Sequence, residues 1–189
     1  VKPHVTDHFH DKEASGWITT DAPGTWAVTA DPTGSSNRVL TQSNATATDA
    51  RATAPAVKAD QSTQARVKGT TFTGNGFMAV FARYQNFDNS YYLLLRNSTR
   101  TLELKKIVSN VATPIGMLTL PATFDFTAWH TLRIDVTGNA TKTTLRGYLD
   151  GELKLSGSDV PGSLTSGKGA VGTFQTAAKF DNIVLTSPP

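Results

Sequence analysis

The sequence predicts an all-β protein, a two-sheet antiparallel jelly-roll sandwich that forms one domain over residues 1–189. Three observations support this prediction. Apolar and polar residues alternate with a period of two from residue 64 onward, turn-forming residues separate the alternating segments, and patterns typical of helices are nearly missing. A chain of this length can bury a full core without disulfides or metals, so one sandwich is expected.

The expected strands follow one another in chain order. They cover residues 64–68, 76–85, 91–96, 101–106, 131–136, 144–149 and 180–185. Residues 137–140 and Asp150-Gly151 are expected to form hairpin turns, because Asp-Gly tolerates the positive φ of a tight turn. Gly74-Asn75-Gly76 is also typical of a turn. The low-complexity segments 31–37 and 43–59 are expected to be surface loops.

Composition narrows the class of function. The chain has no cysteine, so disulfides and thiolate metal sites are excluded, and no apolar run is long enough to span a membrane. A net charge of +3, spread over scattered basic residues, argues against a nucleic-acid partner and mildly favours an anionic polysaccharide. The low charged fraction and abundant Thr, Ser, Ala and Gly favour a secreted protein, which we expect to be a monomer without a membrane partner.

Three apolar strands carry a cation near their C-terminal ends. They are residues 76–85, 91–96 and 101–106. Successive strand side chains point to opposite faces, so Phe81 and Arg83 share one face of their strand, and Tyr92 and Arg96 share one face of theirs. The pattern predicts a sheet with a core side and a cationic, aromatic working side, which would suit a sugar acid.

The order of short motifs along the chain carries a resemblance to a known superfamily. The motifs are Asp7-His8-Phe9-His10-Asp11, Gly16-Trp17, Gly24-Thr25-Trp26, Phe81-Ala82-Arg83-Tyr84-Gln85, Tyr91-Tyr92-Leu93, Ala128-Trp129-His130-Thr131-Leu132-Arg133-Ile134, Leu149-Asp150-Gly151 and Phe180-Asp181-Asn182-Ile183-Val184-Leu185. In this order they resemble the concanavalin A-like lectin/glucanase superfamily, and more narrowly its laminin-G-like and polysaccharide-lyase-associated members. The resemblance implies a jelly roll whose concave face binds an extended glycan. It implies fold more firmly than activity, because the superfamily holds lectins, hydrolases, lyases and binding modules.

Two enzyme groups of this superfamily are recognised by motifs that the chain lacks. Laminarinase-like hydrolases resemble one another through a Glu-x-Asp-x-x-Glu strand that supplies two carboxylates, whereas Glu103 and Glu152 stand alone here. Jelly-roll alginate lyases carry a Gln-(Ile/Val)-His strand, which is also missing. A lyase of this sequence would therefore belong to another jelly-roll group, such as the glucuronan lyases.

A polysaccharide lyase that cleaves a uronic-acid-containing glycan is nevertheless the function that we rank first. β-Elimination removes the C5 proton of a uronate, so the site must neutralise a carboxylate and supply an acid and a base. The catalytic candidates are Tyr92, Tyr148, Arg83, Arg96 and His130, and the substrate-binding candidates are Arg66, Lys105 and Tyr84. A non-catalytic carbohydrate-binding module and a laminin-G-type interaction domain remain alternatives, because strand-end cations and strand tyrosines commonly have structural roles.

Aspartates near the two ends of the chain indicate a structural calcium site. Asp7 and Asp11 would meet Asp181, because the first and last strands of such sandwiches pair and carboxylate oxygens suit Ca²⁺. The resemblance also implies structural calcium at this place. The alternative is that Asp7 and Asp11 are exposed charges at a strand end.

Overall fold

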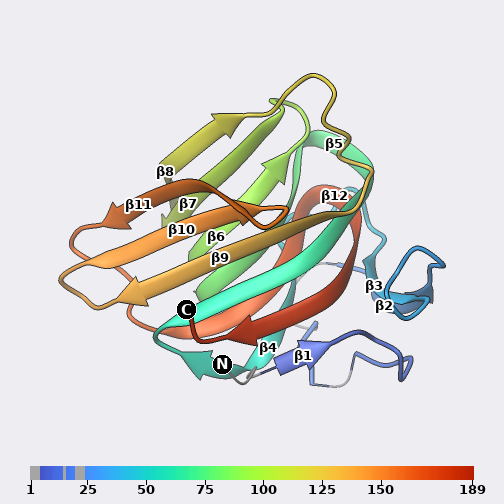
Figure 1. Cartoon of the computed structure of the whole chain (residues 1–189), viewed down its shortest axis with the longest axis horizontal. Coiled ribbons are helices and arrows are strands. Elements are labelled where there is room, and N and C mark those ends of the chain that lie inside the picture. The colour runs from blue at the N-terminus through green and yellow to red at the C-terminus, as the bar shows by residue number, and fades with distance from the viewer. Residues whose placement is uncertain (1–4, 15, 20–23) are drawn as a thin grey trace.

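The computed structural model describes residues 5–14, 16–19 and 24–189, and every regular element in these ranges is a β-strand (Figure 1). The strands are β1 (Val5–Asp7), β2 (Trp26–Ala30), β3 (Arg38–Gln42), β4 (Ala50–Lys58), β5 (Gln61–Asn86), β6 (Asn89–Arg96), β7 (Thr101–Val108), β8 (Val111–Thr119), β9 (His130–Gly138), β10 (Thr143–Leu149), β11 (Glu152–Asp159) and β12 (Gly167–Thr186). The prediction of an antiparallel all-β jelly roll is confirmed. No helix in the described part of the chain is long and apolar enough to cross a membrane.

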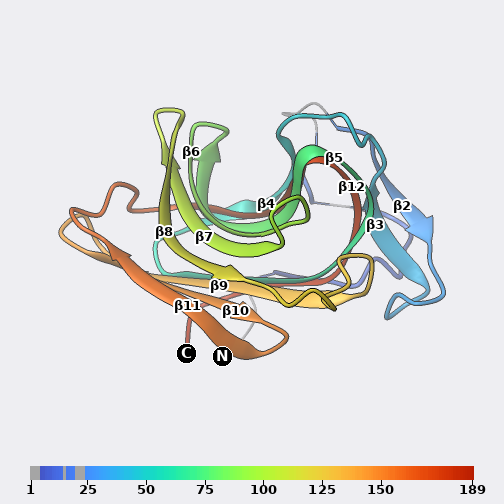
Figure 2. The same cartoon turned by 90° about the horizontal axis from the view of Figure 1, so that it is seen from above.

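The strands form two layers around a shared core (Figure 2). One layer has the order β4-β12-β5-β6-β7-β8, and the other has the order β11-β10-β9-β5-β12-β3-β2 with β1 beside β12. The long strands β5 and β12 therefore belong to both layers. The first layer curves strongly, so its outer face is concave. We call this face the concave face and the outer face of the second layer the convex face.

Glycines allow β5 and β12 to pass together from one layer to the other. The pairing register shifts beside Gln175, whose φ is 46°, and Gly74 faces it with a φ of 50°. A Cβ at Gly76 would lie 2.4 Å from the carbonyl oxygen of Gln175, which no side chain could tolerate. We expected a turn at residues 74–76. The strand instead continues through them, because glycine permits the bend without breaking the ladder.

Period-two alternation divides β5 between the core and the concave face. Met78, Val80 and Ala82 point into the main core, whereas Phe77 and Phe81 point to the concave side. β6 continues the pattern. Each large apolar side chain that is fully buried stabilises the fold by about 1.5–3 kcal/mol. The face of a strand that carries these side chains is therefore buried, and the alternating residues lie on its other face.

The segment 43–59, which we expected to be a surface loop, contains β4. Ala50, Ala52 and Ala54 are fully buried, and the strand pairs with β12. Alanine and threonine made the segment look like low complexity, but its alanines alternate with polar residues as a half-buried strand requires. Two other expected connections are confirmed, since residues 31–37 link β2 to β3 and Asp150-Gly151 links β10 to β11. The turn expected at residues 137–140 lies at residues 139–142, because β9 continues to Gly138.

Candidate functional site

The concave face carries a groove of about 350 Å³. Its lining combines aromatic rings, cations, amides and one carboxylate. The lining residues are Asp49, Arg51, Asn75, Phe77, Phe81, Phe87, Tyr92, Arg96, Lys105, Ile107, Asn110, Ala112 and Phe174. The groove is the candidate site because it unites several of the residues that the sequence singled out.

Strand register places the groove residues in rows across the sheet. Phe81 of β5 lies opposite Tyr92 of β6, which lies opposite Lys105 of β7. In a second row, Phe77 lies opposite Arg96. Directly opposed residues of antiparallel strands share a face. Tyr92, Arg96 and Lys105, all predicted from the sequence, are therefore brought together.

Four aromatic rings stack along the groove floor. Their centroids are 5.4 Å apart between Phe174 and Phe77, 6.3 Å between Phe77 and Tyr92, and 5.5 Å between Tyr92 and Phe81. The interplanar angles are 11°, 28° and 18° in the same order. Because the rings stack on one another, their faces are largely covered. Mainly ring edges, which carry partial positive charge, are left for a ligand.

Arg51 of β4 lies across this floor and is only 5% exposed. Its guanidinium carbon is 4.3 Å from the ring centroid of Phe81, and its nitrogens donate to Asp49 (3.0 Å) and to two backbone carbonyl groups. Gly172 makes room for it, since a Cβ there would lie 2.7 Å from Cδ of Arg51. Burial lowers the pKa of Arg51, but a guanidinium stays charged at neutral pH.

Glu103, buried on the same face of β7 as Lys105, holds two of the groove cations in place. Its carboxylate accepts a hydrogen bond from Nε of Arg96 at 2.8 Å and lies 3.4 Å from Nζ of Lys105. Thr101 donates a further hydrogen bond at 2.8 Å. Burial by itself would raise the pKa of Glu103, but these hydrogen bonds and the charges of Arg96 and Lys105 outweigh it and lower the pKa. Glu103 is therefore a fixed anion.

The hydroxyl of Tyr92 forms no hydrogen bond with any described residue, although it lines the groove. Burial raises the pKa of Tyr92 to about 12, against the opposing effect of the Arg51 and Arg96 charges. At neutral pH the phenol is protonated, so it can donate or accept a hydrogen bond but is a poor proton acceptor for catalysis.

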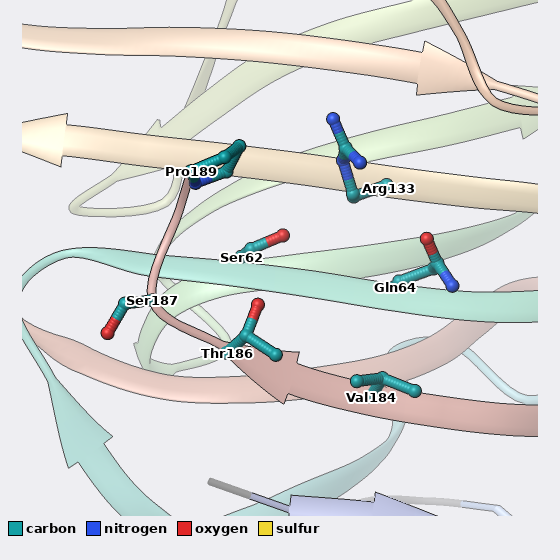
Figure 3. A pocket seen from close by; sticks show the side chains of 7 residues that line it. All are labelled: Ser62, Gln64, Arg133, Val184, Thr186, Ser187 and Pro189. Carbon is teal, nitrogen blue, oxygen red and sulfur yellow. The ribbon is translucent and has the colours of Figure 1, made fainter. Parts of the chain in front are cut away.

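Tyr148 and Arg66 lie on the convex face, on the other side of the sandwich from the groove. The guanidinium carbon of Arg133 lies 3.7 Å from the ring centroid of Tyr148. Arg133 also lines a second cleft on this face (Figure 3). Arg66 pairs with Asp181 at 3.3 Å and covers the ring of Trp129. Neither Tyr148 nor Arg66 can act together with Tyr92 on one ligand.

His130 and Tyr84 have packing roles in the structure. The imidazole of His130 stacks on Phe124 with centroids 4.1 Å apart, contacts the carboxylate of Asp150 at 2.8 Å, and lies outside the groove lining. Tyr84 is buried in the concave-face cluster, where its ring packs edge-on against Phe81. Tyr84 supports the end of the groove without lining it.

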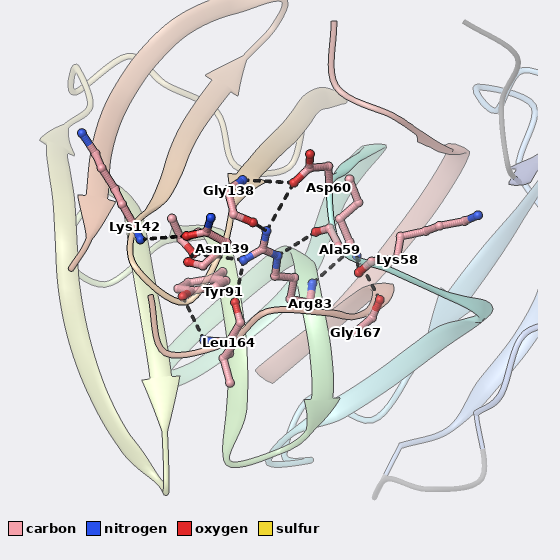
Figure 4. A network of polar contacts seen from close by, with 12 residues as sticks. Lys58, Ala59, Asp60, Arg83, Tyr91, Gly138, Asn139, Lys142, Leu164 and Gly167 are labelled. Atoms are coloured by element: carbon pink, nitrogen blue, oxygen red, sulfur yellow. Dashed lines mark hydrogen bonds and ion pairs between the residues drawn. The ribbon is translucent and has the colours of Figure 1, made fainter. Parts of the chain in front are cut away.

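Arg83, which we expected to share a face with Phe81, is instead fully buried inside the sandwich (Figure 4). Its guanidinium donates to the carbonyl oxygens of Ala59 (2.7 Å), Leu164 (2.5 Å) and Gly138 (2.8 Å). The prediction that Arg83 neutralises a substrate beside Arg96 is wrong. Arg83 has a φ of 48°, which breaks the strand alternation and turns its side chain away from the groove.

The three aspartates proposed as calcium ligands each bind other groups. β1 and β12 do pair, as expected. However, Asp7 accepts hydrogen bonds from a backbone amide and from the indole of Trp17, Asp11 accepts from an exposed backbone amide, and Asp181 accepts from Ser35. No group of three metal-binding side chains occurs in residues 5–14, 16–19 and 24–189. As arranged, these residues do not fit a calcium site.

Replacing Asp181 with alanine is expected to destabilise the protein in a manner independent of metal. Asp181 is fully buried and accepts hydrogen bonds from the amide and hydroxyl of Ser35, so its loss leaves donors unpaired and costs about 2–4 kcal/mol. Thermal melts with and without EDTA test this, and the wild type should melt at the same temperature in both. A chelator-dependent drop in the wild type that disappears in the variant would restore the calcium site.

Comparison with known proteins identifies the fold. Neither a protein-family model nor a curated protein matches the sequence. Among solved structures, the carbohydrate binding module CBM66 from Bacillus subtilis superposes with a TM-score of 0.70 at 19% identity, covering 91% of this chain and 96% of that one. The fold is a jelly-roll sandwich like that of this module.

Two further similar structures belong to carbohydrate-active enzymes. The Bacillus licheniformis β-glucanase has a TM-score of 0.64 at 11% identity, with full coverage of both chains. The Bacteroides ovatus protein described as xyloglucan PUL GH43B has a TM-score of 0.65 at 16% identity, and this chain covers 40% of its length. The resemblance inferred from the sequence is confirmed for the fold.

Sequence reasoning missed Arg51, Glu103 and Phe174 as groove residues. Arg51 lay in the segment that we assigned to a loop, although the alternation Ala50-Arg51-Ala52 was the signal of a strand. Glu103 precedes Lys105 by two residues on one strand, which predicts that their side chains share a face. Phe174 had no such local signal, because its place depends on the pairing of β12 with β5.

Proposed function

We propose that this chain is a carbohydrate-binding domain whose concave groove holds a glycan without cleaving it. The observation that carries the proposal is that each carboxylate at the groove is paired with a cation and that none is held protonated. Asp49 is the one carboxylate among the described residues that line the groove, and it pairs with Arg51 at 3.0 Å. Glu103 is buried beside Arg96 and Lys105, and these partners lower its pKa. Glycoside hydrolysis requires a second carboxyl group that is protonated at working pH.

The groove offers both donors and acceptors to a ligand rich in hydroxyl groups. Arg51, Arg96 and Lys105 donate, Asp49 accepts, and the amide of Asn110 does both. The stacked rings leave mainly edges for the ligand, so hydrogen bonds carry the recognition more than stacking on a sugar face. The similar structures include a carbohydrate-binding module and a β-glucanase, which supports a carbohydrate ligand.

The charges of the groove favour a neutral glycan over the anionic one expected from composition. Arg51 faces Asp49, and Arg96 and Lys105 share Glu103. A uronate would have to displace these partners or approach Asp49, whose side chain is 44% exposed. A neutral sugar hydroxyl can donate to the carboxylate of such an ion pair and accept from the cation. It carries no negative charge that the carboxylate would repel.

A polysaccharide lyase is the second candidate, favoured by the free hydroxyl of Tyr92 among the groove cations. Its difficulty is that a pKa of about 12 leaves almost no Tyr92 phenolate at neutral pH to act as the base. The two functions differ in their products, because a lyase releases an unsaturated uronate and a binding domain releases nothing.

Binding and cleavage can be measured together on two pairs of glycans. Mixed-linkage β-glucan and xyloglucan serve as neutral ligands, and polyglucuronate and alginate serve as anionic ones. We expect calorimetric binding to a neutral glycan, with no new reducing ends and no ultraviolet absorbance from an unsaturated product. Tyr92→Phe should weaken binding about fivefold, the effect of one lost hydrogen bond.

Tyr148→Phe is the matched control, because Tyr148 lies on the convex face, and it should leave this binding unchanged. An unsaturated product from either uronan, abolished by Tyr92→Phe, would establish the lyase in place of the binding domain. Absence of binding to all four glycans would overturn the proposal.

A further inference from the structure

Asn75 is an exposed asparagine that lines the groove, at the bend where β5 passes from one layer to the other. It is the one asparagine in the sequence that is followed by a glycine. The pairing register of β5 with β12 shifts across residues 73–76. The ladder therefore fixes the backbone at Asn75 less firmly than it fixes the segments before and after the bend.

The backbone of Asn75 is held by neighbours, whereas its side-chain amide is held weakly. The backbone N–H donates to Oε1 of Gln175 at 3.2 Å, and the backbone carbonyl oxygen accepts from Nη1 of Arg96. The side-chain oxygen accepts one long hydrogen bond, from the hydroxyl of Ser98 at 3.4 Å. The side-chain nitrogen donates to no described residue. The NH₂ group can therefore leave without breaking a contact.

The packing of the bend requires glycine after Asn75. A Cβ on Gly76 would lie 2.4 Å from the carbonyl oxygen of Gln175 and 2.4 Å from Oγ1 of Thr176, so no other residue fits there. A glycine has no side chain to shield its backbone nitrogen from the side-chain carbonyl of the residue before it. The fold thus retains the neighbour that most favours a reaction between an asparagine side chain and the following amide.

We propose that Asn75 is a site of spontaneous deamidation, which places a second carboxylate in the groove. The backbone nitrogen of Gly76 loses its proton and bonds to Cγ of Asn75. The bond from Cγ to the side-chain nitrogen breaks, and that nitrogen leaves as ammonia with the proton. Water then opens the five-membered imide at either of its two carbonyl carbons, which gives aspartate or isoaspartate. Water is the one further reactant.

The new carboxylate would change the groove beside Arg96, whose guanidinium already contacts the carbonyl oxygen of Asn75. A carboxylate accepts hydrogen bonds but donates none, so it would compete with a sugar hydroxyl for Arg96 and offer the sugar no N–H group. Deamidation is therefore expected to weaken the binding of a neutral glycan. This consequence rests on the proposed function of the groove, whereas the chemical step does not.

Peptide mass spectrometry of the folded protein, stored in mildly alkaline buffer, tests the chemical step. Trypsin releases residues 69–83 as a peptide in which Asn75 is the one side-chain amide, so a mass gain from the exchange of NH₂ for OH reports Asn75 alone. Residues 134–142 provide the matched comparison, because their one side-chain amide is the exposed Asn139, which precedes alanine. We expect the Asn75 peptide to convert about tenfold faster.

Asn75→Gln should abolish this mass gain, because the attack would then have to close a six-membered ring. Equal rates of conversion in the two peptides, or a mass gain that occurs only after unfolding in urea, would overturn the proposal.

Asn75→Asp reproduces the aspartate product and tests its effect on the groove. It should weaken calorimetric binding of mixed-linkage β-glucan or xyloglucan about threefold, whereas Asn139→Asp, outside the groove lining, should leave this binding unchanged. Unchanged affinity for Asn75→Asp would overturn the effect on the groove. If the wild type binds neither glycan, the proposed function fails, and the mass measurement still decides whether Asn75 is modified.

Discussion

Substitution of Arg83 by methionine is expected to lower the free energy of unfolding by about 3–5 kcal/mol. The guanidinium binds the carbonyls of Ala59, Gly138 and Leu164, which come from the β4–β5 connection, the end of β9 and the β11–β12 connection. Methionine fills much of the volume but donates no hydrogen bond, so three carbonyl oxygens lose a partner together. Urea denaturation measured by circular dichroism gives this difference directly.

Arg146→Met is the control for this loss, because Arg146 is an exposed arginine on β10 and its replacement should change stability by less than about 0.5 kcal/mol. Arg83→Lys should fall between the two, since an ammonium group keeps the charge but cannot span the same acceptors. A loss of stability below about 1 kcal/mol for Arg83→Met would show that the three segments bound by Arg83 keep their positions without it.

Glu103→Gln is expected to reduce glycan binding in the groove at least tenfold, about 1.4 kcal/mol. The substitution keeps the shape of the side chain but removes the charge that orients Arg96 and Lys105. Both cations would then become mobile, and the ligand would bear the cost of ordering them. Calorimetry with the best glycan of the panel measures the change.

Glu152→Gln serves as the charge-matched control, because Glu152 is exposed on β11 and pairs only with Lys154 among the described residues. Its affinity should equal that of the wild type. An affinity for Glu103→Gln within twofold of the wild type would mean that the position of Arg96 and Lys105 does not depend on Glu103. A gain in affinity for a uronan would instead indicate an anionic ligand.

The fold and half of the groove could be predicted because both depend on strand alternation. Tyr92 and Arg96 share a face by periodicity alone, and Lys105 joins them once the hairpin register is set. Arg83 could not be placed in this way. Its positive φ is a local exception to the alternation, made possible by Gly167, where a Cβ would lie 2.3 Å from the carbonyl carbon of Arg83.

Two of the predicted site residues, Tyr148 and Arg66, lie on the opposite face of the molecule from the groove for a related reason. Periodicity reveals that Tyr148 and Arg66 point out of their sheet, but it does not tell which of the two layers a strand belongs to. β5 supplies residues to both layers, so Arg66 near its start and Phe81 near its end are exposed on opposite sides of the molecule. Only the bend at residues 74–76 separates them.

The passage of β5 and β12 through both layers also makes the sandwich one cooperative unit. Neither layer can lose β5 or β12 while the other stays intact, because the same two backbones complete both hydrogen-bonded ladders. Local opening that separates β5 from β12 on the groove side must therefore draw on nearly the full free energy of unfolding. A glycan that binds in the groove would slow amide exchange on both faces, so the ligand protects the side of the molecule that it does not touch.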